Sequence, residues 1–279
     1  MGDGGGNRKL VETFRQFSYH CPFMLPSPSP ISQSPSPTFA KMIDHALLHP
    51  TLTDHELRSG CALAVEYAVA SVCVKPFFVA EASELLKGTG VKVGTVVGFP
   101  HGGTGMEAKV FETHSACQSG AEEIDMVINI GKALSGEFGY VEDEIGLIRQ
   151  AATQHGALLK VIFENDYLPN DAIKIKLCEI SERAGADFVK TSTGFGFVKQ
   201  PDGHLQTLGA TEHDLRLMRA HCSPKVQIKA SGGVRDLAGL IRVRELGCTR
   251  CGTSATAKIL EEARNGGTGS ATGLGKGGY

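Results

Sequence analysis

The stretch GADFVKTSTGFG, residues 185–196, places a lysine at the end of a segment that otherwise has the character of a buried β-strand. Asp187, Phe188 and Val189 form a short β-prone run framed by glycines, which is typical of a strand in a parallel sheet. Burying the protonated amine of Lys190 there costs free energy unless the charge is paired or given up. Either this side chain reaches outward to solvent, or the protein needs an amine that can lose its proton.

Strand-like and helix-like segments alternate on both sides of this stretch. We expect strands near residues 41–45, 71–75, 91–99, 123–130, 158–164, 187–192, 226–231 and 248–252. Two of the helices are expected to begin after caps at Thr53 or Asp54 and at Asn170 or Asp171. Eight such β/α units predict an α/β fold of the (β/α)8 or TIM-barrel type. The alternative is a doubly wound open sheet, which is disfavoured because no GxGxxG motif follows the first strand.

Composition divides the chain into three parts. A Pro/Ser tract occupies residues 25–37, and residues 264–279 are rich in glycine. Such segments bury little apolar surface and form few regular backbone hydrogen bonds. We therefore expect a disordered extension over residues 1–37, a single TIM-barrel domain over 38–264 and a flexible tail over 265–279.

Charge and hydropathy narrow the class of protein. The 279 residues carry a formal net charge of −2, so there is no chain-wide basic field for nucleic acid or an anionic membrane. No apolar run is long enough to span a bilayer, and the N-terminus lacks the apolar core of a secretory signal. A cytoplasmic enzyme without nucleic-acid or membrane partners is the expectation.

The eight cysteines are scattered singly, as is usual for reduced thiols, apart from Cys248 and Cys251. These two form a CxxC in a predicted strand. An offset of three should place their side chains on opposite faces of that strand. A lone CxxC is also a weak motif, so no redox or zinc role is expected for it.

Alternation within the predicted strands places several charged residues on one common face. One face of a barrel strand packs against the outer helices and the other points towards the barrel axis. Each charged residue here alternates with apolar neighbours and should therefore point inward; the set is Asp44, Asp125, Lys160, Lys190 and Lys229. Any one of them alone would more often be a surface lysine or a structural carboxylate. Their convergence favours a functional site.

Clustered lysines in a dry interior suit one kind of chemistry. Burial and a cationic neighbour both disfavour the protonated amine. A neutral lysine amine attacks a carbonyl to form a carbinolamine and then a Schiff base, which draws electrons from an adjacent C–C bond. Lys190 is the candidate nucleophile, and Asp125 and Lys229 could transfer the protons.

The predicted loops after the later strands have features of an anion site. Glycine-rich or helix-opening segments follow Lys190, Lys229 and the last strand, where barrels commonly bind phosphate. The candidate phosphate-binding residues are Gly194, Gly232, Gly233, Arg235, Gly252, Thr253 and Ser254. Glycines at such junctions also serve as plain turn residues. The histidines are scattered and form no zinc-like spacing, so neither a metal nor another cofactor is expected.

Several motifs together resemble one known family. They are IDHALL, GFPHG, EEIDMVINIG, LKVIFE, GADFVKTSTGFG and KASGGVR, and the likeness runs from about Ile43 to Leu260. In this combination they are similar to the deoxyribose-phosphate aldolases, which are class I aldolases on a TIM barrel. The resemblance implies reversible cleavage of 2-deoxy-D-ribose 5-phosphate to D-glyceraldehyde 3-phosphate and acetaldehyde.

The resemblance also implies roles for individual residues. The Schiff-base lysine falls on Lys190, the helper lysine on Lys229 and the proton-relay aspartate on Asp125, with Lys160 and Asp44 in supporting positions. Small phosphorylated sugars and aldehydes would be the substrates, and a homodimer is the family expectation. Two alternatives stay open: a related imine-forming aldolase with another phosphorylated substrate, and a sugar-phosphate-binding barrel without turnover.

Overall fold

The structure is a computed structural model, and it describes residues 37–266. The disordered extension and tail expected from the sequence lie outside these residues, except for Pro37, Asn265 and Gly266. Within the described part of the chain, no helix combines the length and the apolar character that a membrane span needs.

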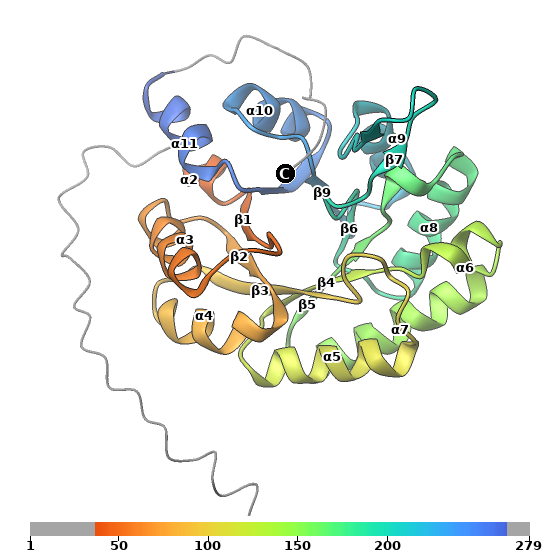
Figure 1. Cartoon of the computed structure of the whole chain (residues 1–279). Coiled ribbons are helices and arrows are strands. Elements are labelled where there is room, and N and C mark those ends of the chain that lie inside the picture. The colour runs from red at the N-terminus through yellow and green to blue at the C-terminus, as the bar shows by residue number, and fades with distance from the viewer. Residues whose placement is uncertain (1–36, 267–279) are drawn as a thin grey trace, which may run out of the picture. The chain divides into compact units, whose positions relative to one another are not determined.

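Eight parallel strands close into a barrel in the order β1-β10-β9-β6-β5-β4-β3-β2, with helices around the outside (Figure 1). The strands are β1 (Ile43–Leu47), β2 (Ser71–Val74), β3 (Lys92–Val97), β4 (Glu123–Val127), β5 (Leu158–Ile162), β6 (Phe188–Lys190), β9 (Gln227–Ser231) and β10 (Cys248–Thr253). Each predicted strand overlaps one of these. The predicted TIM barrel is therefore confirmed, and the open sheet is excluded.

The helices alternate with the strands along the chain. They are α2 (Pro37–Ala40), α3 (Asp54–Glu66), α4 (Val79–Leu85), α5 (Met106–Gln118), α6 (Ile130–Leu134), α7 (Phe138–Gln154), α8 (Asp171–Arg183), α9 (Glu212–His221), α10 (Leu237–Glu245) and α11 (Thr256–Arg264), with short 3-10 turns η2 (Pro76–Phe78) and η3 (Asn165–Tyr167). Thr53 caps α3 in a reciprocal capping box with Glu56, and Asn170 caps α8 through the amide of Ile173. For each of these helices, the cap is therefore one of the two residues predicted from the sequence: Thr53 for α3 and Asn170 for α8.

Strand register brings the predicted inward-facing residues side by side. Asp125 of β4 lies opposite Lys160 of β5, and Lys190 of β6 lies opposite Lys229 of β9. Residues paired across parallel strands point to the same face of the sheet. The alternate residues, including Ile124, Leu159, Val189 and Ile228, are fully buried in the apolar layer beneath the helices.

Strand β10 contains a bulge that changes one prediction. The register with β9 shifts between Cys248 and Arg250, so that Cys248 pairs with Ile228 and Cys251 pairs with Ala230. The extra residue is Thr249. It places both cysteines on the helix-facing side of the strand, where both join the apolar core as free thiols. The prediction that they lie on opposite faces is wrong, because it assumed uninterrupted alternation.

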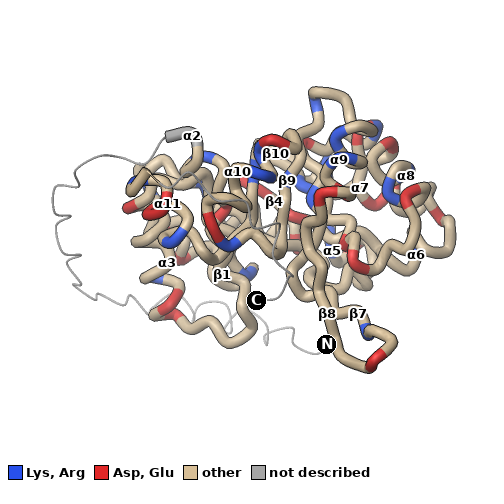
Figure 2. The backbone as a smooth tube through the Cα atoms, turned by 90° about the horizontal axis from the view of Figure 1, so that it is seen from above, with Lys and Arg blue, Asp and Glu red and all other residues tan. Residues whose placement is uncertain are grey.

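A two-stranded antiparallel hairpin of β7 (Val198–Lys199) and β8 (Leu205–Gln206) interrupts the connection between β6 and α9. Figure 2 shows it projecting away from the barrel. The sequence between its strands, QPDGH, is a recognisable turn. Two-residue strands are too short to produce a clear alternation, and the hairpin was not predicted.

The loop after β3 is held by a buried lysine. Lys109 is fully buried on α5, and its Nζ donates to the carbonyls of Gly102 and Val127, each at 2.8 Å. The same ammonium pairs with Glu144 of α7 at 2.7 Å. These contacts draw the loop close to the end of β4, so that a Cβ built on Gly102 would lie 1.8 Å from the carbonyl oxygen of Ile128.

Gly102→Ala is therefore expected to lower the free energy of unfolding by about 2–4 kcal/mol. Gly102 also has a positive φ of 67°, a conformation that alanine adopts only with strain. Urea unfolding would measure the change. Gly103→Ala is the matched control, because its Cβ would meet no atom within 4 Å. Equal stability of the two variants would contradict the close-approach explanation.

Candidate active site in the barrel interior

The carboxylate of Asp125 is the hub of the barrel interior. Its Oδ2 lies 2.9 Å from Nζ of Lys190 and 2.7 Å from Nζ of Lys229. Its Oδ1 lies 2.9 Å from Nζ of Lys160. Asp125 is completely buried, and each lysine is at most 2% exposed. One carboxylate therefore connects three lysines that come from three different strands.

Asp44 of β1 closes the network from the other side of the barrel. Its Oδ2 lies 2.5 Å from Nζ of Lys229 and 3.1 Å from Nζ of Lys160. Its Oδ1 accepts a hydrogen bond of 2.7 Å from the hydroxyl of Ser71. The five interior residues predicted from strand alternation thus form one connected cluster.

Two further charged residues belong to this cluster and were not predicted as site residues. Glu123 of β4 lies 2.6 Å from Nζ of Lys160, and Arg250 of β10 pairs with both Asp44 and Glu123. Glu123 shares the inward face with Asp125, so alternation alone could have identified it. Arg250 reaches the interior because of the β10 bulge, which shifts the alternation of that strand.

Burial and charge act in opposite directions on the pKa values of these groups. Burial alone would raise the pKa of Asp125, but the charges of Lys160, Lys190 and Lys229 and a hydrogen bond from Lys229 hold it well below its usual value. Burial alone would lower the pKa of Lys160, but Asp125, Asp44 and Glu123 hold it well above its usual value. Asp125 is therefore anionic and Lys160 cationic at neutral pH.

The formal charges of the cluster leave one cation in excess. With every group ionised, Lys160, Lys190, Lys229 and Arg250 face the carboxylates of Asp44, Glu123 and Asp125. Loss of one proton from a lysine makes the two signs equal. Among these four cations in the described structure, Lys190 has the fewest carboxylate contacts, so its neutral form breaks the fewest ion pairs.

The three predicted phosphate loops follow neighbouring strands at the same end of the barrel. β6, β9 and β10 are adjacent and parallel, so their carboxyl ends point the same way. Gly194, Gly232 and Gly233 have positive φ values of 90°, 87° and 88°, which favour glycine. A Cβ on Gly252 would lie 3.3 Å from Cε of Lys229, so this glycine leaves room for that lysine.

The last of the predicted phosphate loops differs from the expectation in where its helix begins. Thr253 is the last residue of β10, and its hydroxyl donates to the carbonyl of Val234 at 2.8 Å. Helix α11 begins only at Thr256, two residues after Ser254, so residues 252–254 do not open the helix as predicted. Arg235 and Ser254 are exposed.

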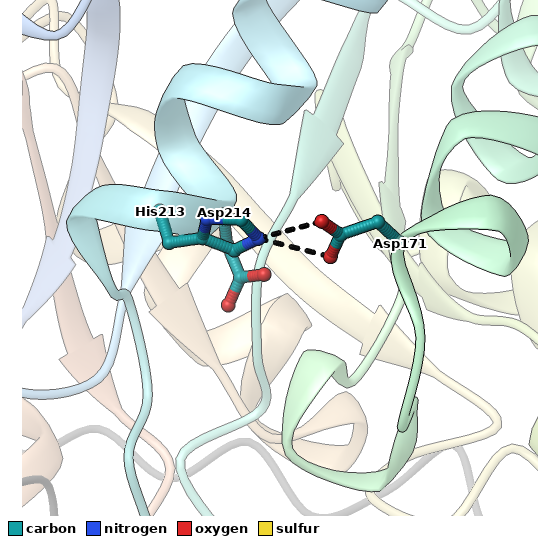
Figure 3. A group of neighbouring side chains, drawn as sticks. All are labelled: Asp171, His213 and Asp214. Atoms are coloured by element: carbon teal, nitrogen blue, oxygen red, sulfur yellow. Dashed lines mark hydrogen bonds and ion pairs between the residues drawn. The ribbon is translucent and has the colours of Figure 1, made fainter.

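One group of side chains among the described residues has the spacing of a metal site: Asp171, His213 and Asp214 (Figure 3). It was not predicted from the sequence. Nε2 of His213 lies 2.8 Å from Asp171, while Asp214 accepts from Nζ of Lys174 at 2.6 Å and from the hydroxyl of Thr211 at 2.8 Å. Each side chain therefore has a partner within the protein, and the group joins α8 to α9.

His45 of β1 is buried, and its ring is held by Thr256. Its Nδ1 lies 2.9 Å from the hydroxyl of Thr256 at the start of α11. Burial lowers the pKa of His45 to about 4, so the ring is neutral at physiological pH. This histidine therefore adds no charge to the interior cluster.

Several known proteins are similar to this chain over most of its length. A deoxyribose-phosphate aldolase of Rhodopirellula baltica is 52% identical over 225 residues, which cover 81% of this chain and 89% of the relative. A deoxyribose-phosphate aldolase of Caldanaerobacter subterraneus is 50% identical over 231 residues, covering 82% of this chain and 95% of the relative.

Among solved structures, the tetrameric deoxyribose phosphate aldolase of Aeropyrum pernix superposes with a TM-score of 0.73 at 32% identity, covering 82% of this chain and 92% of that one. The family model of the DeoC/LacD family aldolases matches residues 38–248, most of the described barrel. The chain belongs to the DeoC/LacD family of aldolases.

Proposed function

We propose that this protein cleaves 2-deoxy-D-ribose 5-phosphate reversibly to D-glyceraldehyde 3-phosphate and acetaldehyde through a Schiff base on Lys190. The observation that carries the proposal is the pairing of two lysine amines on one carboxylate oxygen, with Lys190 at 2.9 Å and Lys229 at 2.7 Å from Oδ2 of Asp125. The relatives named above support the choice of substrate.

The proposed reaction starts with attack of the neutral amine of Lys190 on the substrate aldehyde. The carbinolamine loses water to give an imine, whose protonated form accepts the electron pair of the C2–C3 bond as that bond breaks. In the same step the hydroxyl on carbon 3 loses its proton to a base and becomes the aldehyde of the leaving product. Glyceraldehyde 3-phosphate leaves, and the remaining enamine is protonated at carbon 2. Addition of water to the resulting imine releases acetaldehyde and restores the amine.

Asp125 and Lys229 are positioned to move the protons of these steps. Because both lysines contact the same oxygen of Asp125, a proton can pass between the amines through one carboxylate. The protonated imine serves as the electron sink, which makes the proposed mechanism that of a metal-independent class I aldolase. The glycine-rich loops after β6, β9 and β10 are the proposed site for the substrate phosphate.

A reducing compartment such as the cytoplasm suits the free cysteines of this chain. The seven cysteines of the described region are free thiols, and six of them are buried. Disulfides form in oxidising compartments, so this usage supports a cytoplasmic location. Deoxyribonucleotide catabolism is the proposed setting, since the substrate is a deoxyribose phosphate.

The mechanism predicts a covalent adduct at one residue. Incubation with acetaldehyde followed by borohydride reduction is expected to add one ethyl group to Lys190, as read by peptide mass spectrometry. An adduct at Lys160 or Lys229 would assign the nucleophile elsewhere. Phosphate binding without any adduct would instead favour a binding-only barrel. Activity with a different phosphorylated aldehyde, together with the Lys190 adduct, would favour the related imine-forming aldolase.

A further inference from the structure

Glu164 occupies an unusual position beside the proposed Schiff-base lysine. It lies two residues after the end of β5, is only 1% exposed and has a left-handed backbone conformation with φ 57° and ψ 63°. The backbone on either side of it continues the pairing with the next strand, since the amide of Phe163 donates to Lys190 and that of Asn165 donates to Thr191, each at 3.0 Å. A non-glycine residue persists in this conformation only where its surroundings require it.

The carboxylate of Glu164 holds the loop that follows Lys190. The amide of Thr193 donates to Oε1 at 3.2 Å, and the hydroxyl of Thr193 donates to Oε2. That hydroxyl in turn accepts from the amide of Phe195 at 3.0 Å. A Cβ on Gly196 would lie 3.0 Å from Cδ of Glu164, so the loop wraps tightly around the carboxyl group. Gly194, a candidate phosphate donor, lies within the wrapped segment.

Two charged groups act on Glu164. Burial raises the pKa of Glu164 to about 7, and the negative charge of the nearby Asp166 also raises it. The hydrogen bonds from Thr193 and the positive charge of Lys190 act in the opposite direction and lower this pKa. Asp166 is itself engaged, because it accepts from the amides of Leu208 and Gly209 and from the hydroxyl of Ser192. Glu164 therefore changes its charge near neutral pH inside a loop proposed to receive an anion.

We propose that Glu164 is a positioning residue for the anionic end of the substrate: its carboxyl group shapes the loop from Thr193 to Gly196, and its ionisation weakens binding of the phosphate. The inference rests on the proposed function. Both forms of the carboxyl group can accept from the amide of Thr193, so the loop keeps its shape, whereas the anionic form repels a phosphate.

The test compares wild type with Glu164→Gln, which has the size and the one-donor, one-acceptor pattern of the neutral acid but cannot ionise. KM for deoxyribose 5-phosphate is measured from pH 6 to pH 8, together with the Kd of inorganic phosphate by NMR titration. At pH 8 both constants are expected to be roughly three- to tenfold lower in the variant, and at pH 6 equal. Ionisation of the phosphate itself affects both proteins alike and cancels in the ratio.

Glu164→Ala removes the group around which the loop wraps. Compared with Glu164→Gln, which also lacks the charge, its KM is expected to be about tenfold higher at every pH, because one or two hydrogen bonds to the loop are lost. Trapping of unphosphorylated acetaldehyde on Lys190 should stay within about twofold of wild type, since this ligand makes no phosphate contact. Glu179→Gln is the control, because Glu179 is an exposed residue of α8 paired with Lys176 at 2.9 Å.

Two results would overturn the inference. One is a ratio of KM values between wild type and Glu164→Gln that does not change with pH. The other is a loss of acetaldehyde trapping in Glu164→Ala as large as the rise in KM, which would place the effect on Lys190 instead of the loop. A wild-type protein with neither turnover nor adduct would refute the proposed function itself, and the phosphate titration would still report on Glu164.

Discussion

Replacing Lys190 with alanine is expected to lower kcat at least about 10,000-fold, because the variant has no amine to form the imine. The protein should stay folded. Its interior would then hold three cations against three carboxylates, and Asp125 would keep Lys160 at 2.9 Å and Lys229 at 2.7 Å. Initial rates of aldehyde release and thermal unfolding would measure the two properties on the same preparation.

Lys160→Met is the matched control for this result. Lys160 contacts Asp44, Glu123 and Asp125, so its removal leaves three buried carboxylates with fewer partners. We expect the free energy of unfolding to fall by about 3–5 kcal/mol, in contrast to the small change for Lys190→Ala. Substantial activity in Lys190→Ala would contradict the assignment of the nucleophile, and an unfolded Lys190→Ala would contradict the expectation that the loss of its single ion pair is tolerated.

Lys229→Ala is expected to lower kcat by about 100- to 10,000-fold, the range of a positioned acid–base group. The change removes the second amine on Oδ2 of Asp125 and the cation that pairs with Asp44 at 2.5 Å. With that cation gone, Asp125 pairs more strongly with the ammonium of Lys190 and disfavours the neutral nucleophile. Steady-state kinetics and borohydride trapping together would separate proton transfer from imine formation.

Lys229→Arg separates charge from proton transfer. A guanidinium keeps the positive charge but does not give up its proton at neutral pH. If proton transfer is the role of Lys229, the arginine variant should trap acetaldehyde yet turn over slowly. Near-normal activity of Lys229→Ala would show that the pair of lysines is not required.

The interior cluster was predictable because parallel strands alternate strictly over the residues concerned. Asp125, Lys160 and Lys229 lie in five-residue strands whose other face is apolar, and a period of two then leaves one orientation for the charged side chains. The barrel followed from eight repeats of the same unit. Both predictions depend on short-range patterns, and so they needed only the sequence.

The parts that were missed depend on individual side-chain hydrogen bonds. Glu164 lies on the same alternating face as Lys160, but its importance comes from Thr193, which is 29 residues away. The position of helix α11 depends on the hydroxyl of Thr253, which accepts from the amide of Ala255 at 3.0 Å and delays the first helical turn. Neither interaction leaves a periodic trace in the sequence.

The extra residue in β10 ties the length of that strand to the charge of the barrel interior. Deleting Thr249 would give simple alternation and leave Cys248, Arg250 and Cys251 on their present faces, because their β9 partners Ile228, Lys229 and Ala230 are consecutive. Keeping Thr249 in a strand without the bulge would instead turn Arg250 to the face that Cys248 occupies. A guanidinium turned towards Ile228 and Ala230 would enter an apolar layer, and Asp44 and Glu123 would lose a cation. A redesigned version of this barrel must therefore either keep the bulge at Thr249 or delete that residue, because a regular strand of the same length would move the charge of Arg250.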